Sequence, residues 1–320
     1  MYGLSKKEMS RATQKFGASR IKDMAQATDI LCAKYSEISE GVKNGYRGLM
    51  YSGVRKDFLK ALTEEEIFML HIPKDAVLSI FNIAFMRSIE ENDMEIMREG
   101  ICSYNRLRMY ERIFSGHDEW CALAALSVND NEALGACFPR DIKLLDAGDL
   151  CGPFLVSVRN LLRTILFRTD KKEEAIALAE KTAGAPGFDR GLMMSLAGIA
   201  ERNVRRINES VECMLEFHPR CRWLHTEGYY GTGNLFRYFP VFAIGIYNLA
   251  RTELKEEGEA LILPEKYAWI AEFSDMCMRT ADIHPFFRYP EKIDFMNACT
   301  ERIGSIFPKK MKAVRDAWGR

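Results

Sequence analysis

Histidine, cysteine and arginine side chains gather in one segment of the sequence, HPRCRWLHTEGYYGTGN at residues 218–234. His218, Cys221 and His225 stand three and four residues apart, so on an unbroken helix all three would project from one side, as metal ligands must. Pro219 interrupts such a helix near its start, and the other histidines are remote in the sequence. A structural zinc ion needs a fourth ligand, which the sequence does not offer. We therefore predict no metal ion and no cofactor, and instead a helix start with a half-buried cysteine and two polar histidines.

Arg220 and His225 offer a second kind of chemistry. An arginine can hold a phosphate oxygen in two places, and a histidine can move a proton near neutral pH. Their spacing resembles the R-x4-6-H motif of the HEPN ribonucleases, a helical family in which the arginine and the histidine act on the scissile phosphate. The resemblance covers six residues, with Cys221 where that family usually has a small polar residue or a histidine. It implies, as an alternative, a helical nuclease or metal-dependent hydrolase that uses Arg220 and His225.

The glycine cluster GYYGTGN predicts a turn and not a phosphate-binding loop, because it lacks GKS or GKT, has the wrong spacing for GxGxxG and follows no strand. Its tyrosines, Tyr229 and Tyr230, lie near Trp223 and are flanked by Arg222 and Arg237. Loop aromatics beside arginines have the composition of a protein-binding hot spot, and core filling is the alternative. No GxSxG, HExxH or CxxC motif occurs elsewhere, so the sequence indicates no catalytic site.

The bulk composition is that of a globular protein of 320 residues, 48% of them apolar. Forty-five basic residues balance 45 acidic ones, so no global field attracts nucleic acid or an anionic membrane. No run reaches the roughly 18 uncharged apolar residues of a membrane span. Nine dispersed cysteines indicate reduced thiols in a core. We expect a soluble cytoplasmic protein that binds neither nucleic acid nor membrane.

Apolar residues recur with three-and-four spacing and strand signals are nearly absent, which predicts an all-α fold. Three segments share a pattern of helix, short acidic or amide turn and helix, with turn centres at Asp93, Asp130 and Asp170, roughly 40 residues apart. Hairpins of this kind bury their apolar faces by stacking, so we expect stacked antiparallel helical hairpins in one α-solenoid-like array. In this prediction residues 1–60 form an N-terminal helical elaboration, and residues 61–320 form one continuous helical-hairpin domain.

Local residues mark where several of these helices begin. Thr63 and Glu66 have the spacing of a capping box before an apolar run. Pro73 and Pro264 each stand where a first-turn proline belongs. These signals predict three helix starts, at Thr63, Pro73 and Pro264.

Two segments carry a family resemblance. VSVRNLLRTILFRTDKKEEAIALAEKTAG, residues 156–184, looks like an alanine-rich helix, an acidic turn and a second helix. GNLFRYFPVFAIGIYNLARTELKEEGEALILP, residues 233–264, looks like the loop and helical segment that follow, with Pro240, Ala243 and Ala250 at the matching places. In this order, the features of the C-terminal two thirds resemble the immunity protein 49 family of bacterial polymorphic toxin systems.

The resemblance implies a helical immunity protein, a monomer or homodimer, that binds a cognate protein toxin stoichiometrically and blocks it without catalysis. The toxin would be the C-terminal domain of an effector. From the loop composition we predict five toxin-contact residues: Arg222, Trp223, Tyr229, Tyr230 and Arg237. The alternatives are a helical-repeat scaffold or regulator that binds another protein, and the helical enzyme based on Arg220 and His225.

Overall fold

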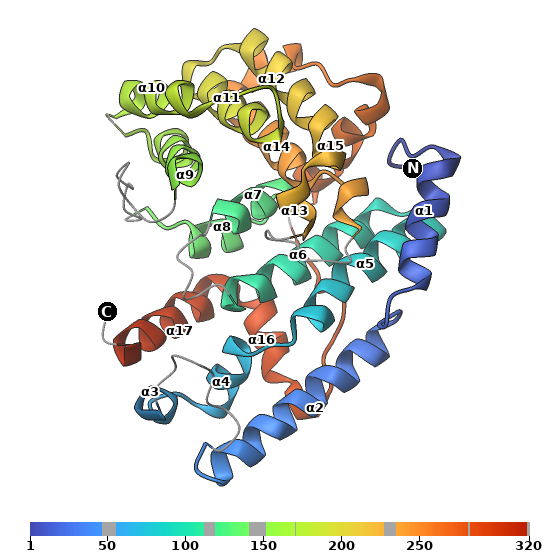
Figure 1. Ribbon diagram of the computed structural model, residues 1–320, viewed down its shortest axis with the longest axis vertical. Helices are drawn as coiled ribbons and strands as arrows, with labels where there is room; N and C mark the ends of the chain where they lie inside the picture. Colours follow the sequence, from blue (N-terminus) through green and yellow to red (C-terminus); the bar gives the residue numbers. More distant parts are fainter. Residues whose placement is uncertain are drawn as a thin grey trace. The chain divides into compact units, whose positions relative to one another are not determined.

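The computed structural model describes residues 1–46, 56–111, 119–140, 152–169, 171–226, 235–280 and 282–318. Helices are the only regular elements within these ranges (Figure 1), so the predicted all-α fold is confirmed. The chain divides into two compact units: unit 1 comprises Met1–Lys15 and Glu119–Ala281, and unit 2 comprises Phe16–Asp118 and Asp282–Arg320. The predicted boundary at residue 60 is not a junction between these units, and the N-terminal elaboration stays a prediction.

Unit 1 holds most of the first helix and the middle of the chain. Its helices are α1 (Lys6–Gly17), α7 (Glu119–Ser127), α8 (Asn131–Cys137), α9 (Gly152–Phe167), α10 (Lys172–Thr182), α11 (Phe188–Glu201), α12 (Val204–Phe217), α13 (Arg222–Thr226), α14 (Val241–Leu254) and α15 (Trp269–Arg279). Its 3₁₀ turns are η1 (His218–Arg220), η2 (Phe236–Tyr238), η3 (Lys255–Ala260) and η4 (Glu265–Tyr267). Helix α11 packs along α12 and against α9, α10 and α14, while α14 also packs against α7 (Figure 1). Helices α11 and α14 are therefore central to this unit.

Unit 2 is built around a nearly fully buried helix. Its elements are α2 (Met24–Lys43), α3 (Lys56–Lys60), α4 (Glu64–Leu70), α5 (Lys74–Glu90), α6 (Met94–Glu111), η5 (Glu291–Ile293), α16 (Phe295–Glu301) and α17 (Ile303–Trp318). Helix α5 packs against α2 and α6, and apolar side chains around most of its circumference are buried. On α6, Arg106 donates a hydrogen bond to the carbonyl oxygen of Thr300, which satisfies the end of α16.

The three predicted hairpins are present as packed helix pairs: α5 with α6, α7 with α8, and α9 with α10. In the first turn, Asp93 Oδ1 accepts from the backbone N–H of Glu95 at 2.8 Å. In the second, Asp130 Oδ1 accepts from the backbone N–H of Ala133 at 3.0 Å. Asp170, the predicted centre of the third turn, lies outside the described residues. The hairpins are confirmed, and their stacking into one continuous array stays a prediction.

The predicted helix starts agree with the structure to within one residue. Thr63 and Glu66 form both bonds of the capping box: Thr63 Oγ1 accepts from the Glu66 N–H at 3.2 Å, and Glu66 Oε2 accepts from the Thr63 N–H at 2.8 Å. Pro73 and Pro264 are the N-cap residues of α5 and η4, one position before the first helical residue.

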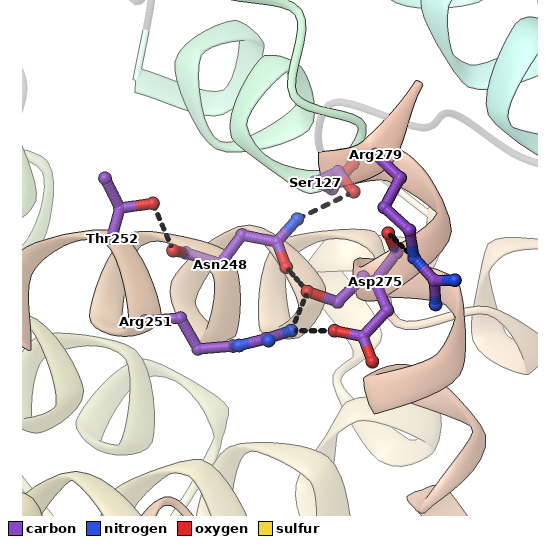
Figure 2. A network of polar contacts seen from close by, with 7 residues as sticks. Ser127, Asn248, Arg251, Thr252, Asp275 and Arg279 are labelled. Atoms are coloured by element: carbon purple, nitrogen blue, oxygen red, sulfur yellow. Dashed lines mark hydrogen bonds and ion pairs between the residues drawn. The ribbon is translucent and has the colours of Figure 1, made fainter. Parts of the chain in front are cut away.

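A polar network joins α7, α14 and α15 inside unit 1 (Figure 2). The side-chain amide of Asn248 on α14 donates to the carbonyl oxygen of Ser127, the last residue of α7, at 3.1 Å, and accepts from the hydroxyl of Ser274 on α15. Arg251 donates to the same hydroxyl at 3.0 Å and to Asp275 Oδ1 at 2.6 Å. Because the last carbonyls of a helix lack partners within it, Asn248 satisfies the end of α7 from a neighbouring helix.

No single helix in the part of the chain that the structure describes is long and apolar enough to cross a membrane. Helices α4 and α5 meet the length and composition criteria only when counted together, across a bend of 68°.

Candidate functional site

The segment with the candidate residues folds as short pieces and not as one helix. Helix α12 ends at Phe217, η1 follows, and the backbone of Cys221 is extended (φ −68°, ψ 97°) before α13 begins. Pro219 in η1 has no N–H with which to continue α12, which accounts for the break. His218, Cys221 and His225 therefore do not share one helical face. Within the described ranges, no group of three His, Cys, Asp or Glu side chains is arranged to hold a metal ion.

Two buried histidines hold this turn together. The Nε2–H of His218 donates to the carbonyl oxygen of Phe236 at 2.7 Å, and the Nε2–H of His225 donates to the carbonyl oxygen of His218, also at 2.7 Å. Because a carbonyl oxygen can only accept, the neutral rings both carry their proton on Nε2. The rings meet edge to face with centroids 5.1 Å apart. The pair thus ties η1 to α13 and to η2.

Burial sets the charge of these side chains. Loss of hydration lowers the pKa of His218 to about 3, and the neighbouring His225 acts in the same direction. Burial also lowers the pKa of His225 to about 4, against the opposing effect of its hydrogen bond to the carbonyl of His218. Burial raises the pKa of the Cys221 thiol to about 11. At pH 7 both histidines are neutral and the cysteine is protonated, which suits a structural role better than proton transfer or metal binding.

Replacing His225 with glutamine is predicted to make unit 1 less sensitive to acid. The folded pKa of His225 lies below the value of about 6.5 in an unfolded chain, so its stabilising contribution is complete above that pH and is lost as the pH falls toward 4. Glutamine removes the titration but keeps an N–H for the carbonyl of His218. Between pH 6 and pH 5, we expect the pH slope of the free energy of unfolding to drop by about 1 kcal/mol per unit. Urea titrations followed by tryptophan fluorescence measure this slope, and equal slopes for both proteins would contradict the prediction.

Trp223 belongs to an aromatic cluster that connects several helices. Its ring centroid lies 5.3 Å from that of Trp120 on α7, 5.9 Å from Phe154 on α9 and 6.1 Å from Phe188 on α11. Its indole N–H donates to Asp189 Oδ1 at 2.9 Å. Burial raises the pKa of this carboxyl group, and the hydrogen bond from Trp223 opposes that rise. The indole is therefore held in one orientation by rings on three sides and by a carboxylate.

A cleft of about 740 Å³ opens beside Trp223. Phe154, Phe188 and Trp223 contribute aromatic surface to its wall. Three arginines with exposed side chains also line it: Arg190 on α11, Arg220 in η1 and Arg222 on α13. Asp189 is the only acidic residue among the described residues of its lining, so the cleft presents an excess of positive charge around an aromatic wall.

The structure brings together part of the predicted contact set. Arg222 and Trp223 both line the cleft. Arg237 does not line it, and its exposed guanidinium instead donates to the carbonyl oxygen of Pro219 at 3.2 Å, which braces η1. Tyr229 and Tyr230 lie outside the described residues.

The two residues of the alternative catalytic pair, Arg220 and His225, do not both line the cleft. Arg220 lines the cleft, whereas His225 is not part of its lining, is 7% exposed and donates to a backbone carbonyl. An arginine and a histidine that act on one phosphate must reach the same space. In this arrangement Arg220 faces the cleft and His225 supports the turn behind it.

Sequence reasoning missed the part of the cleft lining that comes from α9 and α11, which includes Phe154, Phe188, Asp189 and Arg190. The last three open α11 directly after a connection that contains Gly184 and Gly187. The sequence signal that could have indicated them is the run of an aromatic, an acidic and a basic residue at a helix start. The hydrogen bond between Asp189 and Trp223 joins residues 34 positions apart and leaves no periodic trace in the sequence.

Comparisons of the chain with models of protein families, with curated proteins and with solved structures find no match. The resemblance to the immunity protein 49 family therefore stays a prediction.

Proposed function

We propose that this chain is a cytoplasmic immunity protein, which binds a cognate bacterial protein toxin one to one and blocks it without catalysis. The observation that carries the proposal is the cleft beside Trp223, in which a fixed indole and exposed arginines stand together. Tryptophan and arginine are the residues most enriched among those that dominate binding energy at protein interfaces. An indole that is already oriented also loses little conformational freedom when a partner binds.

The use of the two histidines supports binding over catalysis. His218 and His225 donate their Nε2–H groups to backbone carbonyls and have low pKa values, so neither histidine is a proton-transfer group tuned to neutral pH. Cys221, with its raised pKa, is a weak nucleophile. Among the described residues around this turn, the arginines and aromatic side chains that line the cleft are the groups available to a partner.

The proposal that the partner is a toxin rests on the family resemblance. The two segments that carry it, residues 156–184 and 233–264, include most of α9, all of α10 and the whole of α14. These helices support the cleft: α9 and α10 pack on each other, and α14 carries Phe242, whose ring stacks 5.1 Å from Trp120. The segments that carry the resemblance thus include helices that pack against α11, which contributes Phe188, Asp189 and Arg190 to the cleft.

Coexpression tests this function. The chain is produced with the C-terminal domain of the protein that its neighbouring gene encodes, and both survival of the cells and co-purification are measured. We expect survival only when both proteins are present, and a one-to-one complex. Death of the cells despite full expression of this chain, with no complex, would overturn the proposal.

Charge reversal at Arg222 is predicted to weaken that complex by about 30-fold in Kd, the effect of a single hot-spot residue of about 2 kcal/mol. Arg222 is exposed, so Arg222→Glu is expected to leave the fold intact. Arg11→Glu is the matched control, because Arg11 is an exposed arginine of unit 1 on α1 that does not line the cleft. Calorimetric titration of both variants with the toxin domain measures the difference. Equal loss of affinity in the two variants would show a general charge effect and not a contact in the cleft.

A further inference from the structure

The three arginines of the cleft come from separate elements and point to one kind of ligand group. Arg190 lies in the first turn of α11, Arg220 in η1 and Arg222 in α13. Arg190 is steadied by a hydrogen bond from its Nη1 to the carbonyl oxygen of Gly184 at 2.9 Å. The guanidinium of Arg220 makes no hydrogen bond or ion pair with any residue in the described ranges. Guanidinium groups bind carboxylates with paired, parallel hydrogen bonds, so this set is suited to more than one carboxylate.

The wall between these charges is suited to an aromatic or large apolar side chain. Phe154, Phe188 and Trp223 form the ring cluster, and Phe217 and Met193 extend the apolar lining. Offset and edge-to-face ring pairs are favourable beyond the area that they bury. A volume of about 740 Å³ lies within the range of pockets that enclose ligands, about 300–1,000 Å³, and so admits a side chain with its flanking backbone.

We propose that the cleft binds an acidic peptide segment of the partner, in which an aromatic side chain contacts the wall and flanking carboxylates pair with Arg190, Arg220 and Arg222. This inference rests on the proposed function, since it names the chemistry of the toxin segment that would enter the cleft. A segment of this composition is complementary both to the arginine charges and to the aromatic rings of the cleft. A basic segment would be repelled by the arginines, and a purely polar segment would not pack against the rings.

The surroundings of the cleft favour a short acidic segment over a nucleic acid. A second hollow of about 380 Å³ shares Arg190, and its lining also includes Glu180, Arg206 and Glu209. Arg206 is already paired with Glu180 at 2.9 Å. A nucleic-acid backbone that continued past Arg190 would therefore meet carboxylates, whereas proteins that bind single strands keep a basic groove along the whole path.

Blocked tripeptides test the proposal without the toxin. The full chain, labelled with ¹⁵N, is titrated at low salt with Asp-Phe-Asp, with Lys-Phe-Lys and with Asp-Gly-Asp, each acetylated and amidated. The indole N–H signal of Trp223, assigned with a Trp223→Phe variant, reports on the cleft. We expect Asp-Phe-Asp to shift this signal saturably and Asp-Gly-Asp to bind at least about fivefold more weakly. Lys-Phe-Lys is expected to cause no shift. Arg220→Glu should weaken Asp-Phe-Asp binding at least tenfold, and Arg11→Glu should leave it unchanged.

Three outcomes overturn the proposal: no shift with Asp-Phe-Asp, equal shifts with Lys-Phe-Lys, or tighter binding of a single-stranded oligonucleotide at the same signal. The two proposals fail separately. If the toxin complex forms and weakens in Arg222→Glu but Asp-Phe-Asp does not bind, the immunity function stands and the acidic segment is wrong. If Asp-Phe-Asp binds as expected but no toxin complex forms, the proposal that the cleft binds an acidic segment stands and the proposed immunity function is wrong.

Discussion

Replacing Arg159 with methionine is expected to lower the free energy of unfolding by about 3–5 kcal/mol. Arg159 on α9 is 7% exposed and pairs with Glu119, the first residue of α7, which is fully buried. Methionine keeps an apolar stem of similar reach but leaves the carboxylate of Glu119 without this partner in a place that water does not reach. Since a domain is stable by only about 5–15 kcal/mol, this loss is a large fraction of the total. Urea unfolding followed by tryptophan fluorescence suits the measurement, because Trp120, Trp223 and Trp269 all lie in unit 1.

The same pair allows a stringent control. The double variant Glu119→Leu with Arg159→Met removes both charges, and replacing a buried ion pair by apolar groups is often neutral. We therefore expect it to recover most of the stability that Arg159→Met loses. Arg205→Met, which breaks the exposed ion pair with Glu209 on α12, is expected to leave the unfolding midpoint unchanged. If the double variant were as unstable as the single one, packing around Arg159 and not the stranded charge would be the cause.

The fold was predictable to the extent that local signals determine it. The capping box at Thr63 and Glu66 formed as expected because both bonds join residues three apart. Asp93 and Asp130 mark hairpin turns for the same reason: a side-chain oxygen caps the helix that follows it. No local sequence signal indicates that residues 1–15 group with the middle of the chain. Long-range contacts produce this grouping, among them those of Tyr2, whose buried ring packs 5.0 Å from both Phe239 and Trp269, far away in the sequence.

The candidate site divides in the same way. The sequence drew attention to residues 218–237 by composition alone, and Arg222 and Trp223 do line a cleft. Periodicity could not indicate that His218 and His225 would be used inside the turn, because their acceptors are backbone carbonyls, which every residue offers. Periodicity also could not indicate that Asp189 contacts Trp223, since the hydrogen bond that orients Trp223 joins residues on different helices. Those contacts depend on how α11 packs, which is a property of the whole unit.

Gly245→Ala, the addition of one methyl group, is expected to destabilise unit 1 by about 3 kcal/mol. Gly245 lies on α14, where a Cβ atom would stand 2.2 Å from the carbonyl oxygen of Leu123 on α7. Because backbone lies on both sides of this contact, no side-chain rotation can relieve it and the helices must separate. Separation would stretch the hydrogen bonds from Asn248 to the carbonyl oxygens of Leu126 and Ser127, now 2.9 and 3.1 Å. Urea unfolding measures the loss.

Gly135→Ala is the matched control for the same chemical change. Gly135 lies within α8, exposed, with nothing within 4 Å of the place that a Cβ atom would take, so alanine there should stabilise by about 0.5–1 kcal/mol through its helix preference. The two variants are thus expected to change stability in opposite directions, and a gain in both would contradict the close approach of α7 and α14. The approach also bears on the cleft, since Trp120 on α7 packs against both Phe242 on α14 and Trp223. We therefore expect Gly245→Ala, and not Gly135→Ala, to weaken partner binding even where the protein is still folded.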